Sequence, residues 1–195
     1  TYTITDNEDL PTIDFNTISS SGAESVSSKA ITVDLSSASG KDITVDYAVT
    51  GTATGSGTDF ILANGTLNIS AGSTSGIINI ESIVDDSIDE EAETIILTLS
   101  SPTNANLGSD NVHTYTINDN DDPPVIDFDL TSSSGDEANS SKVVTINLSA
   151  PSIQDVTVNY AITGTATGSG TDFTLEDGSL TISAGATSGT ITIGN

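Results

Sequence analysis

The stretch that decides the fold is residues 43–60, ITVDYAVTGTATGSGTDF, which recurs at residues 156–173 as VTVNYAITGTATGSGTDF. The similarity extends outward, because residues 1–82 align with residues 114–195 at a constant offset of 113 residues, with no gap and more than half of the positions identical. Such self-similarity marks a tandem array of one structural unit. A unit of this length can bury its own core, so we expect a chain of similar domains.

Apolar and polar residues alternate along short β-branched runs, as in ITVDL at residues 31–35. This alternation is typical of half-buried strands, and clusters of Gly, Ser, Asn and Asp separate the runs without any helical periodicity. The first repeat is expected to form seven strands, near residues 12–16, 29–36, 42–50, 65–70, 76–84, 93–100 and 112–118. Seven strands in this length predict an all-β fold of tandem immunoglobulin-like antiparallel β-sandwiches.

One face of each predicted strand supplies the candidate core. The aromatic residues Tyr47, Phe60 and Tyr115 are expected to fill that core rather than to stack on a ligand. The other candidates are Ile31, Val33, Leu35, Ile43, Val45, Val49, Leu67, Ile69, Ile95, Leu97, Leu99 and Ile117.

The phase of the repeats predicts three segments. Residues 1–10 match the end of a preceding repeat, and residues 11–122 form one complete repeat. Residues 123–195 form a second repeat, which stops before the counterparts of its last two strands. We therefore expect the sequence to be a piece of a longer protein.

The charge is strongly one-sided, with 28 acidic residues against Lys29, Lys41 and Lys142 and a formal net charge of −25. Nucleic acid and anionic membrane surfaces attract basic proteins, so neither is an expected partner. No apolar run approaches the ~20 residues that cross a bilayer, so no membrane insertion is expected in this segment. The absence of Cys removes disulfides and thiolate metal sites.

The acidic residues gather in loops that would share one end of the sandwich. If successive strands alternate in direction, every second loop lies at the same end, and four such segments contain eleven acids: Glu24, Asp59, Asp85, Asp86, Asp89, Glu90, Glu91, Glu93, Asp119, Asp121 and Asp122. The loops at the other end contain only one acidic residue, Asp110. Crowded carboxylates repel unless they are protonated, solvated or bound to a cation. An all-oxygen set in flexible loops suits Ca²⁺ better than Mg²⁺, and a solvated acidic face is the alternative.

Several short motifs then resemble the Calx-β repeat, which is found in sodium–calcium exchanger regulatory domains and in bacterial surface proteins. They are GTA at 51–53, GTDF at 57–60, GTL at 65–67, SAG at 70–72, DD at 85–86, DEE at 89–91, LSSP at 99–102 and TINDND at 116–121. The resemblance implies an immunoglobulin-like sandwich that binds Ca²⁺ at one end. By position it implies the ligands Glu24, Asp59, Asp85, Asp86, Glu90, Glu93, Asp119 and Asp121.

Departures from the family pattern limit where calcium is expected. Asn120 stands where the exchanger domains have an acid. The second repeat retains only Glu137 and Asp172 of the ligand positions, and Asp6, Glu8 and Asp9 match the tail of a preceding unit. We expect calcium chiefly in the first repeat.

The expected function is that of a calcium-stiffened spacer or stalk in a large cell-surface or extracellular adhesin or matrix protein, with neighbouring repeats as partners. Pro123 and Pro124 restrict the linker that follows the acidic end. Alternatives are a calcium-sensing regulatory domain, a cadherin-like adhesion repeat, and a filament subunit. In the filament, residues 1–4 of one chain would complete the open sheet of the next, giving head-to-tail homo-assembly.

An enzyme is not expected. The short loops offer no insertion that would form a pocket around paired carboxylates. No Gly-x-Ser-x-Gly elbow lies between a strand and a helix, and His113 has no catalytic constellation around it.

Overall fold

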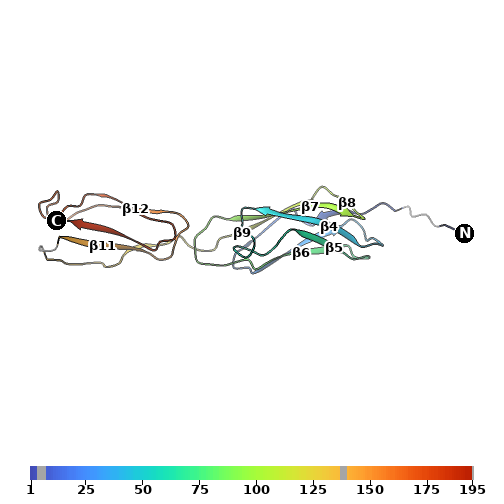
Figure 1. Cartoon of the computed structure of the whole chain (residues 1–195), viewed down its shortest axis with the longest axis horizontal. Helices are drawn as coiled ribbons and strands as arrows, with labels where there is room; N and C mark the ends of the chain where they lie inside the picture. Colours follow the sequence, from blue (N-terminus) through green and yellow to red (C-terminus); the bar gives the residue numbers. More distant parts are fainter. Residues whose placement is uncertain (4–7, 137–139, 195) are drawn as a thin grey trace. The chain divides into compact units, whose positions relative to one another are not determined.

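The computed structural model describes residues 1–3, 8–136 and 140–194. Asp6 and Glu137 therefore lie outside the described residues. The chain forms two compact units, the first comprising residues 1–86 and 91–120 and the second residues 87–90 and 121–195. All elements in the described ranges are strands (Figure 1), which confirms the all-β prediction. The described residues contain no helix that could span a membrane.

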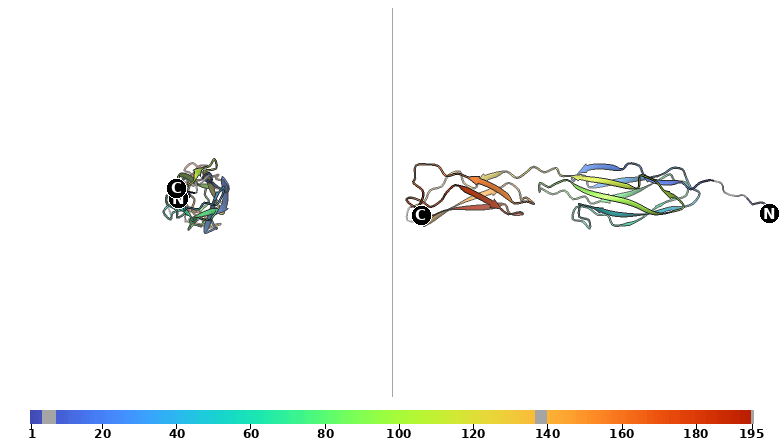
Figure 2. Two further views of the ribbon diagram at one scale, coloured as in Figure 1. Left: turned by 90° about the vertical axis from the view of Figure 1, so that its right-hand side faces the viewer. Right: turned by 90° about the horizontal axis from the view of Figure 1, so that it is seen from above.

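The first unit is a sandwich of two sheets (Figure 2). One sheet has the order β6-β3-β1-β8, and the other has the order β2-β9-β7-β4-β5. The strands are β1 (Thr12–Phe15), β2 (Ser19–Ala23), β3 (Ser28–Leu35), β4 (Ile43–Gly51), β5 (Gly65–Ile69), β6 (Ser75–Glu81), β7 (Glu93–Thr103), β8 (Asn106–Leu107) and β9 (Val112–Asn118). The seven predicted strands are present, and β2 and β8 were not predicted.

β1 and β2 follow one another closely in the chain but belong to different sheets. β1 pairs with β3 antiparallel, whereas β2 pairs with β9 in parallel. The buried His113 on β9 lies beside this crossing. Its Nδ1 donates to the carbonyl oxygen of Thr17 at 2.5 Å, and its Nε2 lies 2.9 Å from Ser20 Oγ. His113 is thus a packed structural residue that fixes the crossing of the first strand from one sheet to the other.

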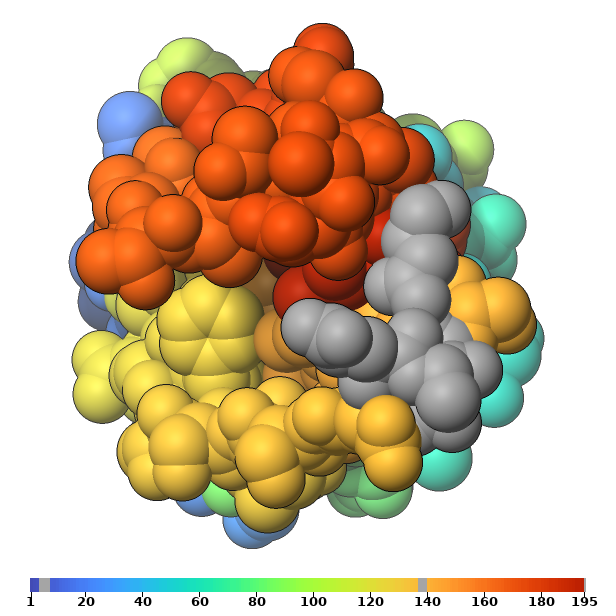
Figure 3. Space-filling model, turned by 90° about the vertical axis from the view of Figure 1, so that its left-hand side faces the viewer, coloured from blue at the N-terminus to red at the C-terminus, as the bar shows by residue number. Residues whose placement is uncertain are grey.

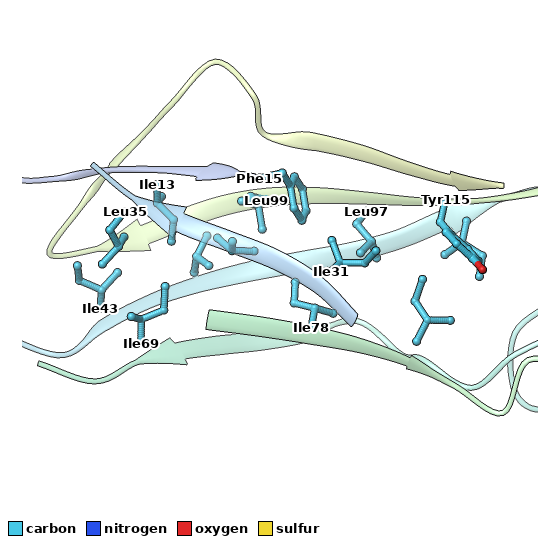
Figure 4. Packing of buried hydrophobic residues seen from close by; sticks show 14 of the residues in the cluster. Ile13, Phe15, Ile31, Leu35, Ile43, Ile69, Ile78, Leu97, Leu99 and Tyr115 are labelled. Carbon is cyan, nitrogen blue, oxygen red and sulfur yellow. The ribbon is translucent and has the colours of Figure 1, made fainter. Parts of the chain in front are cut away.

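The core of the first unit lies between the two sheets, and both contribute to it (Figure 4). The predicted alternation holds along β1, β3, β6, β7 and β9, whereas in β4 it is limited to the first residues. Most of the predicted core residues are buried, and Tyr47, Val49 and Leu67 are partly buried against them. Phe60, in the loop after β4, is also buried in this cluster. Burial of about 25 cal/mol per Å² of apolar surface makes this cluster the main source of stability for the unit.

The second unit contains β10 (Ile126–Phe128), β11 (Ser141–Leu148), β12 (Val156–Tyr160), β13 (Gly178–Ile182) and β14 (Ser188–Gly194). They form the sheets β10-β11-β14 and β12-β13. At the offset of 113 residues they correspond to β1, β3, β4, β5 and β6. Residues 132–136, which correspond to β2, form no strand, and among its described residues the second unit has no strand that corresponds to β7, β8 or β9.

Candidate metal centre

The candidate centre is built where β2 and β9 end side by side. These strands are parallel, with Ala23 opposite Asn118, so the residues that follow each strand emerge at the same end of the unit. The backbone N–H of Glu24 donates to the carbonyl oxygen of Asn118 at 3.0 Å. This bond extends the β2–β9 pairing by one residue and brings Glu24 close to Asp119.

Glu24, Asp119 and Asp121 form the cluster. A carboxylate oxygen of each lies within 4.8 Å of the others. Glu24 is only 6% exposed, and both aspartates are partly buried. Three carboxylates at such distances repel one another, and their partial burial weakens the screening by water. A cation would relieve this repulsion.

The donor set fits a hard divalent cation. Carboxylate oxygens are the ligands of Ca²⁺, which accepts six to eight oxygens from side chains, carbonyls and water in flexible geometry. Asp119 and Asp121 alternate with Asn120 along the chain after β9, and such alternate spacing puts two carboxylates on one side of an extended segment. Glu24, Asp119 and Asp121 would hold the ion.

Asn120 connects the cluster to a second acidic loop. Its Oδ1 accepts a hydrogen bond from the backbone N–H of Ser25 at 3.3 Å, and its Nδ2 donates to Asp85 Oδ1 at 3.2 Å. The amide therefore bridges two carboxylate-bearing loops, which an aspartate at this position could not do because it has no N–H to donate. The sequence marked Asn120 as a departure from the family and gave no sign of this bridge.

Asp59 makes hydrogen bonds that shape its own loop. Its Oδ2 accepts from the backbone N–H of Thr54 at 2.5 Å, and its carbonyl oxygen accepts from the N–H of Val84 at 3.0 Å. The side-chain bond joins the two sides of the loop at residues 54–59. The backbone bond connects this loop to Val84, the residue just before Asp85. The loop thus lies at the predicted end of the unit.

The remaining predicted ligands are less closely gathered. Asp85 and Asp86 are exposed, whereas Glu90 and Glu93 are partly buried. Within the described residues, only one group of three such side chains has its ligand atoms all within 4.8 Å of one another, namely Glu24, Asp119 and Asp121. The metal-binding roles of Asp59, Asp85, Asp86, Glu90 and Glu93 stay predictions.

Tyr115 packs against β2 at Gly22, which lies two residues before Glu24 in the sequence. A Cβ added to Gly22 would overlap the Tyr115 hydroxyl, so the glycine makes room for the ring. Tyr115 is fully buried, which raises the pKa of its hydroxyl, and Lys29 Nζ lies 5.9 Å from the ring centroid. The strand that ends just before Glu24 is thereby packed directly on the core.

Comparison with known proteins identifies the repeat. The model of the Calx-beta domain family matches residues 6–121 and again residues 119–194. The apo-form Calx CBD1 domain is 26% identical, with a TM-score of 0.52, over 58% of this chain and 100% of that domain. The calcium binding domain CBD12 of CALX1.1 is 22% identical, with a TM-score of 0.52, over 92% of this chain and 74% of that one. The search of curated proteins gave no match.

Proposed function

The chain belongs to the Calx-beta domain family, whose members bind Ca²⁺, and we propose that its first repeat holds calcium at Glu24, Asp119 and Asp121. One observation carries the proposal: three carboxylates from the ends of two parallel strands meet within 4.8 Å, and one of them is buried. Calx-beta domains are binding and regulatory domains, and in this proposal the chain is a binding module without catalytic activity.

Calcium would connect parts of the chain that are distant in sequence. Glu24 follows β2, whereas Asp119 and Asp121 follow β9. Asp121 is also the second residue before Pro123, where the linker to β10 becomes restricted. An ion bound by all three side chains would hold the start of that linker against the first unit.

We propose on this basis that the repeats are a calcium-stiffened spacer of a cell-surface or extracellular protein, with binding of targets assigned to other parts of it. The absence of Cys and the large negative charge are compatible with that setting. A regulatory calcium sensor is the alternative. It would require a conformational change on binding and an affinity in the micromolar range, whereas extracellular modules bind at ~10⁻⁴–10⁻³ M.

Isothermal titration calorimetry of the chelator-stripped chain tests the metal centre. We expect heat with Ca²⁺ and little with Mg²⁺, and loss of the Ca²⁺ signal in Asp121→Asn. The matched control is Asp122→Asn, which removes the neighbouring exposed carboxylate and should leave binding intact. If both variants changed Ca²⁺ binding equally, the acidic residues would be a solvated surface without a specific site, and the proposal would be contradicted.

Small-angle scattering separates the two roles. A spacer is expected to show a narrower distribution of interatomic distances, with an unchanged first unit, when Ca²⁺ is added. A sensor is expected to change the exchange protection of strands within the first unit itself. A scattering profile that Ca²⁺ leaves unchanged would rule out stiffening.

A further inference from the structure

Asn120, just after β9, connects two segments that are distant from it in the sequence. Its Oδ1 accepts from the backbone N–H of Ser25, and its Nδ2 donates to Asp85 Oδ1. These partners fix the orientation of the amide, because a backbone N–H can only donate and an ionised carboxylate can only accept. One side chain therefore joins the exit of β9 both to the loop after β2 and to residues 82–86, which follow β6.

Backbone hydrogen bonds lead up to this contact along residues 82–86. The N–H of Ile83 donates to the carbonyl oxygen of Ser27 at 3.1 Å, in the loop after β2. The N–H of Val84 donates at 3.0 Å to a carbonyl oxygen of the loop after β4. The bond from Asn120 to Asp85 comes next along the chain and adds the exit of β9 to the same assembly. Hydrogen bonds thus gather these acidic segments of the first unit without a cation.

The individual loops close without Asn120. In the loop after β4, Asp59 Oδ2 accepts from the N–H of Thr54 at 2.5 Å. In the equivalent loop of the second unit, Asp172 Oδ2 accepts from the N–H of Thr167 at 2.7 Å. Figure 3 shows this second loop in orange at the surface of its unit. Because the closure is the same in both units, the contribution of Asn120 is the connection between segments and not the shape of one loop.

An acid at position 120 could not make this connection. Aspartate has the size of asparagine but no N–H, and it would place a further negative charge opposite Asp85. In the sequence, Asn7 stands at the position equivalent to Asn120 and lies outside the described residues, whereas Glu8 replaces the neighbouring Asp121. The amide therefore recurs in both copies although the acid beside it changes.

We propose that Asn120 is a positioning residue that takes the place of a cation, because its amide holds Asp85 against the exit of β9 when no metal is bound. The first repeat then keeps these segments gathered with or without Ca²⁺. A ligand moves a segment only if it binds the two arrangements with different affinity, so the amide suppresses the loop movement that a sensor requires. This inference rests on the proposed calcium centre and refines it in favour of the spacer.

The test is NMR measurement of backbone order parameters at residues 84–86 of the 195-residue chain, in chelator and in saturating Ca²⁺. The wild type should give values near ~0.85, as for rigid backbone, in both conditions. Asn120→Ala removes the bridge, and Asn120→Asp removes it and adds a charge, so both should fall below ~0.6 in chelator. Saturating Ca²⁺ should restore rigidity in Asn120→Asp, because a cation can connect two carboxylates where the amide did.

The matched control is Asn118→Asp, which adds the same charge two residues earlier in the chain. Asn118 accepts from the N–H of Glu24 through its carbonyl oxygen, so the substitution leaves that bond in place, and residues 84–86 should stay rigid. Residues 167–172 of the second unit are the internal reference and should be unchanged in every variant.

The chelator measurements contain no metal, so they decide the role of Asn120 even if calorimetry rejects the calcium centre. A wild-type segment that is mobile in chelator, or an Asn120→Ala segment as rigid as the wild type, would overturn the proposal. The same conclusion would follow if Asn118→Asp released the segment equally, because charge and not the bridge would then control it. An Asn120→Asp segment that stays mobile while calorimetry shows Ca²⁺ bound would contradict the substitution of amide for cation.

Discussion

The two repeats have closely related sequences but different degrees of burial. Phe15 in β1 is 3% exposed, whereas Phe128 at the equivalent position in β10 is 60% exposed. Phe15 belongs to the core cluster of the first unit, and its ring centroid lies 5.5 Å from that of His113 on β9, whereas the described part of the second unit has no strand that corresponds to β7 or β9. Burial is thus decided by the strands that arrive later in the sequence and not by the residue itself.

Residues 19–23 and 132–136 make the same point for secondary structure. Both segments contain the sequence Ser-Ser-Gly, and only the first is a strand. β2 forms because β9 supplies its hydrogen-bonding partners in parallel register. A segment without apolar alternation has no strand preference of its own, so its state depends on that partner.

The strongest way to break this comparison is to truncate the paired phenylalanines. Phe15→Ala should lower the free energy of unfolding of the first unit by about 3–5 kcal/mol, because it leaves a cavity in a closed core. Phe128→Ala should change the second unit by less than about 0.5 kcal/mol, because the ring is mostly solvated. Urea titration followed by NMR signals from each unit measures both, and equal losses would show that the second unit is closed in solution.

Calcium should act on the first repeat. At a concentration 100 times the dissociation constant, the ion is expected to stabilise that unit by about 2.7 kcal/mol. Glu24→Gln should remove the shift in melting temperature, because it neutralises the buried ligand. Asp172→Asn, which changes a predicted ligand position of the second repeat, serves as the control and should leave the shift unchanged.

Gly22 and Gly135 stand at equivalent positions of the two repeats, and replacing them should have effects of intermediate size on stability. Gly22→Ala should destabilise the first unit by about 1–3 kcal/mol, because the new methyl group overlaps the Tyr115 hydroxyl. Gly135→Ala should be close to neutral, because nothing lies within 4 Å of its new methyl group. Thermal unfolding of the two variants measures the difference, and a neutral Gly22→Ala would show that β2 is less firmly seated on the core than the structure indicates.

The smallest effect concerns pH. Burial raises the pKa of the Tyr115 hydroxyl above the ordinary tyrosine value of 10.0, so the unfolded chain releases this proton at a lower pH than the folded unit. The first unit should therefore keep its full stability below pH 10 and lose some as the pH rises beyond it. Tyr115→Phe should flatten this alkaline loss. Urea titrations of both forms between pH 8 and pH 11 test it, and identical slopes would contradict it.

Sequence periodicity predicted the seven main strands and their inward faces, because alternation along a strand directly reports which side is buried. It missed β2 and β8, since a serine-rich segment and the two residues Asn106–Leu107 become strands only through parallel partners. Loop parity placed Glu24, Asp119 and Asp121 at one end. It could not reveal that these three lie within 4.8 Å, or that Asn120 bridges two loops, because both depend on the β2–β9 register.

The parallel pairing of β2 with β9 also has a mechanical consequence. These strands lie near the entry and the exit of the first unit, and five residue pairs connect them in register. When the chain is pulled at both sides, parallel strands are drawn past one another lengthwise, so their hydrogen bonds bear the tension together instead of opening one after another. The hydrogen bonds of His113 to Thr17 and Ser20 further connect β9 to the start of β2. The unit is therefore expected to resist extension most strongly along the direction in which tandem repeats transmit it.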